Sequence, residues 1–344
     1  MKVLLNHTTP FSLAHGGVTN IVHQTHAVLL KCGLETEYLR WWDTTQRGDI
    51  LFHFGRPPIA LVRFAKSAGL LVVAEHVMTG LVSRPSWKRT IQKRIIETLR
   101  ASFPQAVSDT FSWDSFDLVD MNFFPSAWDA SVARHMFNVR AEKSFILPYG
   151  ANDAFLLSAD VPRESYLITT STITPRKCVV ELATACHAAR VPLKVVGKPY
   201  AVSDQYFERF KKLEQLSEFI EHIPHITDQA ELASLYRRAR GFVLLSSMET
   251  ISQSAIEAAA CRTPLLLSDM DWAHRSFGKS AAYCPVTNST EKTSAVVRNF
   301  YDRAPELAPD WRPPSWQEAR GCLHQVFEDL ARKKSDFVLA ASHM

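Results

Sequence analysis

The sequence lacks the features of several common protein classes. Its longest apolar stretches, residues 69–74 and 242–245, are far shorter than the roughly 20 residues of a membrane-spanning helix. The N-terminus turns polar after three apolar residues, so it predicts a buried strand instead of a secretion signal. We therefore expect a cytoplasmic protein.

Metal and nucleic-acid sites are also poorly supported. The six cysteines are scattered, without a CxxC pair or a histidine at zinc spacing, so they predict neither a disulfide framework nor a metal centre. A net charge of +4 is too small, for 344 residues, to indicate a nucleic-acid partner. No GxGxxG follows the first apolar run, which argues against a dinucleotide dehydrogenase.

What is present indicates two folded domains. The length suits two domains of roughly 150 residues each. The composition, with 46% hydrophobic and 22% charged residues, is that of a folded soluble protein. Two domains imply a cleft between them.

Short apolar runs alternate with helical patterns along the whole chain. This alternation predicts α/β domains, each a doubly wound parallel sheet covered by helices. The runs are residues 3–5, 50–54, 70–74, 121–125 and 144–147 in the first half, and 166–170, 193–196, 219–222, 242–245 and 264–267 in the second. Helices are expected at 21–30, 84–100, 179–190, 228–239 and 254–261.

Proline and glycine at residues 147–152 place the domain boundary near 150. The first domain is then 1–150 and the second 151–312. Ser315 and Glu318 form a capping-box pattern that predicts one helix from there to about Lys333. By pattern alone, this last segment, 313–344, could dock on either domain.

The most informative segment places two acids around a turn. The apolar run 242–245 leads to Glu249, and a predicted helix carries Glu257. An acid at the carboxyl end of a strand faces the crevice where α/β folds bind ligands. The next helix offers the amides near Ser252, Gln253 and Ser254 to a diphosphate. Alternatively, Ser254 and Glu257 form a capping box and Glu249 is a solvated loop acid.

This segment resembles the donor-binding signature of retaining GT-B glycosyltransferases of family 4, the glycosyl transferases group 1. The resemblance implies two Rossmann-like domains facing across a cleft, with a C-terminal helix that crosses back to the first domain. It also implies that Glu249 lies near the transferred sugar and that Glu257 holds the ribose hydroxyls.

Other segments resemble the same family in the expected order. The glycine loop His15-Gly16-Gly17 resembles the loop that admits the donor's distal phosphate, because glycine has no Cβ to block it. Lys177 matches the family's diphosphate-binding lysine, with Arg176 beside it. A glycine pair is otherwise only a turn, and two adjacent cations are otherwise a solvated basic pair.

Two further positions match. Gly197 ends a strand where the family's backbone turns close to the nucleotide, or it simply terminates that strand. His76 ends a central strand of the first domain, where the family has a histidine facing the sugar. A packed structural role is the alternative for His76.

The chain also departs from the family pattern. Thr172 stands where the family has an arginine, and Thr250, Ser252 and Arg262 stand where it has glycines. These departures keep open a catalytically weakened nucleotide-sugar-binding protein. A sugar-nucleotide epimerase on the same fold is a further alternative.

The resemblance implies a retaining, metal-independent, hexosyltransferase-like enzyme without a cofactor. Its donor would be a UDP- or GDP-sugar, and its acceptor a glycan or lipid-linked molecule of cell-surface polysaccharide or glycoconjugate synthesis. Glu249, His76 and Lys177 are the expected catalytic residues.

Residues 84–100 predict a second kind of partner. They carry six basic residues and one acidic residue, with Trp87, Ile91, Ile95 and Leu99 at helical spacing. A basic amphipathic helix can lie on an anionic membrane, here the inner face. The alternative is a surface helix that packs its apolar stripe on the first domain's sheet.

Overall fold

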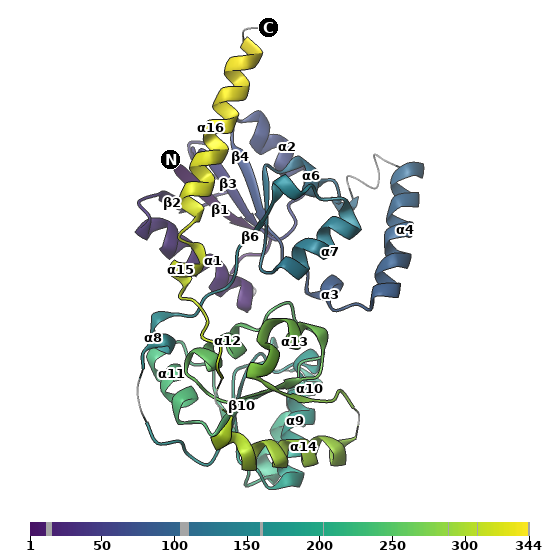
Figure 1. The fold of residues 1–344 in the computed structure, drawn as a ribbon, viewed down its shortest axis with the longest axis vertical. Coiled ribbons are helices and arrows are strands. Elements are labelled where there is room, and N and C mark those ends of the chain that lie inside the picture. Colours follow the sequence, from purple (N-terminus) through teal and green to yellow (C-terminus); the bar gives the residue numbers. More distant parts are fainter. Residues whose placement is uncertain are drawn as a thin grey trace. The chain divides into compact units, whose positions relative to one another are not determined.

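Two units, each built on one sheet, make up the fold. The computed structural model describes residues 1–11, 16–103, 110–158, 161–201, 203–287, 289–307 and 309–342, with side chains described to Asp336. Unit 1 comprises Met1–Gly150 and Trp316–Met344, and unit 2 comprises Ala151–Ser315 (Figure 1).

The sheet of unit 1 has six parallel strands in the order β2-β1-β3-β4-β5-β6. This is a doubly wound order, and it reverses between β1 and β3. The strands are β1 (Lys2–His7), β2 (Glu35–Tyr38), β3 (Ile50–Phe54), β4 (Leu71–Glu75), β5 (Met121–Phe124) and β6 (Ser144–Ile146).

Helices cover both faces of this sheet. In α1 the buried residues recur at helical spacing from Ile21 to Leu29, so one apolar face meets the core. Near the chain's end, Phe327 packs edge-on against Phe52 of β3 and also contacts Phe123 of β5. The helices are α1 (Gly17–Lys31), α2 (Ile59–Ser67), α3 (Thr79–Val82), α4 (Ser86–Ser102), α6 (Ser115–Leu118), α7 (Ala127–Phe137), α15 (Trp316–Arg320) and α16 (Leu323–Ser342).

The prediction of one continuous helix after Ser315 is wrong. Helix α15 ends at Arg320 and α16 begins at Leu323. Gly321 lies at the break, where glycine's low helix propensity favours an interruption. Ser315 itself pairs with Ala151 in unit 2, so the chain returns to unit 1 at Trp316.

A buried ion pair ties the returning segment to the sheet of unit 1. Arg320 donates to both carboxylate oxygens of Glu75 at 2.7 Å each, and also to Thr25 at 2.6 Å. Both charged side chains are fully enclosed. Sequence patterns gave no sign of this pair.

The sheet of unit 2 has six parallel strands in the order β12-β11-β10-β7-β8-β9. This is the classic Rossmann order, and it reverses between β7 and β10. The strands are β7 (Leu167–Thr170), β8 (Leu193–Val196), β9 (Ile220–Ile223), β10 (Gly241–Leu244), β11 (Leu265–Ser268) and β12 (Ala282–Cys284).

The helices of unit 2 follow its strands in alternation. They are α8 (Asp153–Leu156), α9 (Val179–Ala189), α10 (Gln205–Leu216), α11 (Gln229–Arg238), α12 (Gln253–Ala260), α13 (Asp271–Phe277) and α14 (Thr290–Arg303). A short 3-10 helix, η2 (Pro175–Lys177), precedes α9. The α/β, doubly wound architecture predicted for both halves is confirmed.

Candidate active site

Charged residues gather where the strand order of unit 2 reverses. Arg176 and Lys177 lie in η2, in the connection that follows β7, and Glu249 lies in the turn that follows β10. Because β7 and β10 are parallel neighbours, both connections leave the sheet at the same edge. This edge is where open α/β sheets bind ligands.

Glu249 is held between two cations. Its Oε1 accepts hydrogen bonds from Lys177 Nζ and, at 3.1 Å, from Arg176 Nη1. Arg176 Nη1 also donates to the carbonyl of Met248 at 2.7 Å. With 7% exposure, Glu249 is not a solvated loop acid. Burial lowers the pKa of Lys177, and the charge of Glu249 opposes this shift.

Further hydrogen bonds fix the two loops to each other. The carbonyl of Arg176 accepts from the amide of Ser247 at 2.9 Å, and from the hydroxyls of Ser246 and Ser247 at 3.2 and 3.0 Å. These hydrogen bonds therefore hold the cations and the acid in a defined relative position. They do not form a solvated basic pair on a free loop.

Helix α12 follows the Glu249 turn. Ser252 is its N-cap and accepts from the amide of Ala255 at 3.3 Å, while its hydroxyl also lies 3.2 Å from that of Ser254. The alternative of a Ser254–Glu257 capping box is wrong, because Ser252 holds the cap position. The first-turn amides of a helix have no intrahelical acceptors, so the end that begins at Gln253 can attract an anion.

Glu257 lies inside α12 with 8% exposure. Burial raises the pKa of its carboxyl to about 8, and the neighbouring Gln253 and Tyr236 offset part of that shift. A protonated carboxyl both donates and accepts hydrogen bonds. It is therefore suited to a neutral polar group such as a diol.

Gly197, at the end of β8, is required by the packing of unit 2 itself. A Cβ there would lie 1.9 Å from the carbonyl oxygen of Ser171, and the backbone φ is +153°. The carbonyl of Gly197 lies 2.9 Å from His222 Nε2. Glycine therefore lets the ends of β7 and β8 approach each other.

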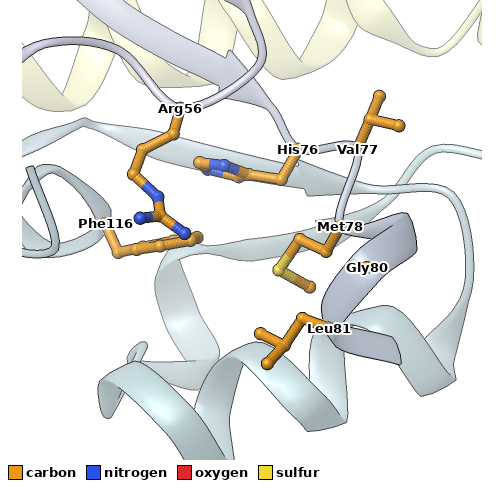
Figure 2. A pocket seen from close by; sticks show the side chains of 7 residues that line it. All are labelled: Arg56, His76, Val77, Met78, Gly80, Leu81 and Phe116. Carbon is orange, nitrogen blue, oxygen red and sulfur yellow. The ribbon is translucent and has the colours of Figure 1, made fainter. Parts of the chain in front are cut away.

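The remaining predicted residues belong to unit 1. His76 follows β4 and is 1% exposed, with its ring stacked 4.3 Å from Phe116 and its Nε2 2.8 Å from Asn122 Oδ1. Burial lowers its pKa to about 3, so the ring is neutral at physiological pH. His76 also lines a cavity at this edge of the sheet (Figure 2).

Gly16 and Gly17 lie at the start of α1. A Cβ at either position would meet no protein atom of the described chain within 4 Å, and the φ of Gly17 is not positive. Neither packing nor backbone conformation therefore requires glycine at position 17. His15, in the same motif, lies outside the described residues.

Comparison with known proteins identifies the class. Residues 159–307 match the family described as glycosyl transferases group 1. This chain is a glycosyltransferase. The matched region covers most of unit 2, including every site residue described there.

Solved structures of glycosyltransferases resemble this chain over nearly its whole length. Sucrose-phosphate synthase from Thermosynechococcus elongatus aligns with a TM-score of 0.69 at 14% identity, over 96% of this chain and 99% of that one. Anabaena HepE in complex with UDP aligns at 0.63 and 12%, over 100% of both chains. WaaG, a glycosyltransferase involved in lipopolysaccharide biosynthesis, aligns at 0.61 and 14%, over 94% and 95%. The fold is GT-B. No curated protein matches the sequence.

One departure from the family pattern has a structural consequence in this glycosyltransferase. Arg262, where the family has glycine, adopts a left-handed backbone with φ of +57°. That conformation costs a non-glycine residue roughly 1–2 kcal/mol. Glycine at this position would adopt the same left-handed backbone at lower cost.

Sequence reasoning missed three residues of unit 2 with buried hydroxyls. Tyr236 of α11 is wholly buried, with its hydroxyl near both Thr170 and Glu257. The hydroxyls of Thr170 and Ser171 are buried without a hydrogen-bond partner in the described chain. The only available signal was the run of hydroxyl residues at 169–172, directly after an apolar strand.

Proposed function

We propose that this glycosyltransferase moves a hexosyl group from a UDP- or GDP-sugar to a glycan or lipid-linked acceptor, with retention of configuration. The observation that carries the proposal is Glu249, buried between Lys177 and Arg176 where the sheet order of unit 2 reverses. HepE, whose fold is similar, binds UDP and UDP-glucose, which favours a UDP-sugar as the donor.

Each charged group has a role in this proposal. Lys177 and Arg176 stabilise the negative charge that develops on the leaving diphosphate, together with the first-turn amides of α12. Arg176 thereby supplies the guanidinium of the family's arginine, whose position is occupied by Thr172 in this chain. Two cations and a helix terminus provide the charge stabilisation that a metal ion would otherwise supply, so the proposed transfer needs no metal.

Glu249 and Glu257 act on different parts of the donor. Glu249 lies near the transferred sugar and stabilises positive charge on its ring, while the leaving phosphate takes the proton of the acceptor hydroxyl. Glu257, protonated until the pH approaches 8, binds the ribose hydroxyls. Gly17 leaves room for the distal phosphate.

The test is donor consumption by variants of the charged cluster. Glu249→Gln and Lys177→Met should each lower kcat by about 10²–10³-fold, the usual effect of losing one preorganised electrostatic partner. Arg176→Lys should retain more activity than Arg176→Ala. The change Glu142→Gln, at an exposed carboxylate of unit 1, is the matched control.

Product analysis separates the alternative functions. An epimerase would convert the donor without an acceptor, and a binding protein would bind UDP without turnover. Full activity of Glu249→Gln would contradict the proposed mechanism.

We also propose that helix α4 places the enzyme on an anionic membrane. Trp87, Ile91 and Ile95 are 61%, 52% and 53% exposed, so this stripe does not pack on the sheet. Of the residues at this spacing, only Leu99 is partly covered, and Ile96 is the apolar residue that packs inward. Figure 1 shows α4 at the edge of unit 1 beside α7. No described helix has the length and apolarity needed to cross a bilayer.

A further inference from the structure

A cavity of about 200 Å³ opens at the carboxyl edge of the unit 1 sheet. Figure 2 shows Arg56 and His76 on one side of it and Met78 and Leu81 on the other, with Phe116 beneath the guanidinium. Arg56 directly follows β3, one of the two strands between which the sheet order reverses. The cavity thus lies at the edge of the sheet where doubly wound folds bind ligands, and the connections after β3 and β4 supply most of its lining.

Arg56 presents most of its hydrogen-bond donors without a protein acceptor. Its guanidinium carbon lies 5.3 Å and 5.0 Å from the ring centroids of Phe116 and Phe137. Its one hydrogen bond in the described chain runs from Nη1 to the carbonyl of Phe111, at 3.2 Å. No described carboxylate forms an ion pair with it, whereas Arg176 and Arg320 each pair with a glutamate.

A cation in such a position favours an anionic ligand. Aromatic rings cover part of the guanidinium, and this desolvation, together with the charge of Arg100, lowers the pKa of Arg56, although the residue as a whole is exposed. The side chain still remains accessible from solvent. A guanidinium fork matches the two oxygens of a phosphate or a carboxylate.

The other residues that line the cavity restrict the charge and polarity of the ligand. His76 is neutral and its Nε2 faces Asn122, so it adds no second charge. Met78 and Leu81 supply apolar surface opposite the guanidinium. The volume is large enough to hold several water molecules. One anionic group attached to a body with apolar CH surface, such as a sugar ring, fits these walls.

We propose that this cavity binds an anionic substituent, a phosphate or a carboxylate, of the acceptor sugar, and that Arg56 recognises it. The inference rests on the proposed function, since only a transferase has an acceptor. It adds the chemical class of that acceptor for this chain.

The experiment titrates the full-length protein with four small probes, followed by NMR. The probes are glucose, glucose 6-phosphate, glucuronate and glycerol 1-phosphate, which represents a lipid headgroup. Excess UDP keeps the sugar phosphate away from the cations of unit 2. Arg56→Gln is compared with Arg134→Gln, a change at an exposed arginine of α7 for which no ion pair is seen in the described chain.

The wild type and Arg134→Gln should bind at least one anionic sugar more tightly than glucose. Arg56→Gln should weaken that binding by about 10- to 100-fold, as expected for the loss of charge-assisted hydrogen bonds, and leave glucose unaffected. Arg56→Lys should recover only part of this binding, because lysine keeps the positive charge but lacks the two parallel N–H donors of the guanidinium.

Two results would overturn the inference. The first is wild-type binding of both anionic sugars no tighter than that of glucose. The second is equal binding of the anionic sugars by Arg56→Gln. If glycerol 1-phosphate binds as tightly as glucose 6-phosphate, the cavity recognises a headgroup and the sugar assignment fails.

The affinities for UDP and GDP, measured for the same proteins, separate this inference from the proposed function. If the wild type binds neither nucleotide, the proposed donor site fails, whatever the result for Arg56. If either nucleotide binds normally and the anionic sugars show no dependence on Arg56, only the present inference fails.

Discussion

Glu257 combines burial with a carboxyl group that is protonated at neutral pH. Its pKa in the folded chain, about 8, lies above the ordinary value of 4.5. The stability that this raised pKa contributes is complete below pH 4.5 and is lost as the pH rises through 8. Folding therefore opposes ionisation of this side chain.

The change Glu257→Gln tests this reasoning. At pH 5 the variant and the wild type should have similar free energies of unfolding. By pH 9 the wild type should be less stable than the variant by on the order of 2 kcal/mol or more. Urea unfolding at both pH values measures the difference, with Glu142→Gln as the exposed control. A constant difference across this range would show that Glu257 ionises freely.

The glycines of the two units serve different purposes, and substitution should separate them. Gly17→Ala adds a Cβ with no described protein atom within 4 Å, so stability should be unchanged or slightly higher, while UDP-sugar affinity falls about tenfold. Gly197→Ala drives a Cβ into the Ser171 carbonyl and should cost ~3 kcal/mol of stability. Thermal unfolding and UDP titration of both variants check these outcomes. A destabilised Gly17→Ala would indicate a purely structural glycine.

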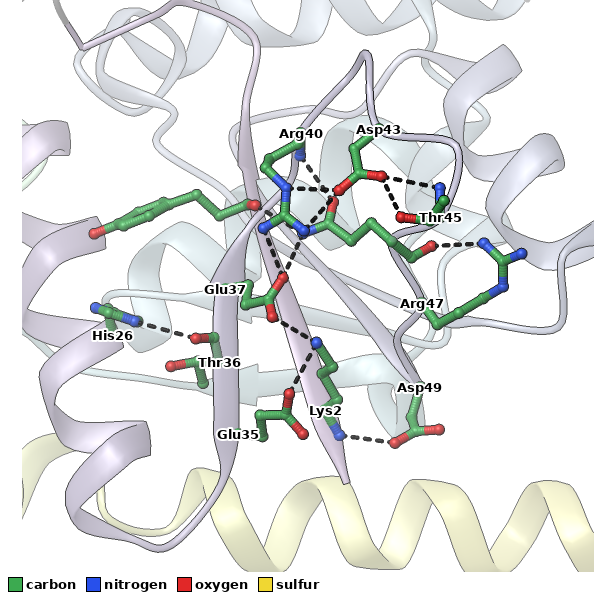
Figure 3. A network of polar contacts seen from close by, with 12 residues as sticks. Lys2, His26, Glu35, Thr36, Glu37, Arg40, Asp43, Thr45, Arg47 and Asp49 are labelled. Atoms are coloured by element: carbon green, nitrogen blue, oxygen red, sulfur yellow. Dashed lines mark hydrogen bonds and ion pairs between the residues drawn. The ribbon is translucent and has the colours of Figure 1, made fainter.

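At the scale of elements, the strands missed by sequence patterns were the edge strands β2 and β12. Both are short: β2 has no apolar run, and β12 contains only the three apolar residues Ala-Tyr-Cys. Strand β2 reads Glu-Thr-Glu-Tyr and is held at the edge by ion pairs from Lys2 Nζ to Glu35 at 2.8 Å and to Glu37 at 2.6 Å (Figure 3). Ion pairs between residues distant in the chain thus fix the position of β2, whereas buried apolar residues fix β3 and β4.

The Glu37 side chain shows the strength of this local network. Hydrogen bonds, first from Lys2 and then from Gln46 and Arg40, lower its pKa to about 2. The same network links Arg40 to Asp43 in the loop that follows β2. Such pairing depends on the fold that brings β1 and β2 together, which no local pattern encodes.

The exposed apolar residues of helix α4 give a prediction about membrane binding. The double change Ile91→Ser and Ile95→Ser removes apolar surface that faces solvent, so the fold should keep its stability. Partitioning onto vesicles that contain anionic lipids should fall about tenfold. Phe64→Ser, on the exposed side of α2, is the matched control and should leave binding unchanged. Equal flotation of all three proteins would remove the membrane proposal.

At the scale of the whole molecule, unit 1 is assembled from both ends of the chain. Glu75 and Arg320 are 245 positions apart and form a fully buried ion pair. The guanidinium of Arg320 also lies over the rings of Trp316 and Tyr149, at 5.0 and 5.7 Å. The C-terminal segment is therefore part of the core of unit 1.

Removing Arg320 should test that role. Arg320→Met leaves the carboxylate of Glu75 buried without its partner and should cost about 3–5 kcal/mol. Adding Glu75→Gln to the same chain should restore part of the loss, because the uncompensated charge is removed. Arg332→Met, on the exposed face of α16, is the control. Urea unfolding measures stability, and an undamaged single variant would contradict a structural role for the pair.

Local sequence patterns alone determined which segments become buried strands and which of these strands are followed by candidate site residues. The alternation of apolar runs and helical spacing defined two α/β halves, and Glu249 and Glu257 stood out because they flank a strand-to-helix turn. These features depend on near neighbours in the chain. They could therefore be derived before any fold was known.

Only the tertiary structure decided strand order, the break between α15 and α16, the pairing of Glu75 with Arg320, and the position of Arg56 in a cavity. Each depends on contacts between residues far apart in sequence. A local pattern shows the hydrophobic period of a helix or strand and the chemistry of its residues. It does not show which distant side chains will contact those residues. Burial by such distant neighbours also set the pKa of Glu257 and of His76.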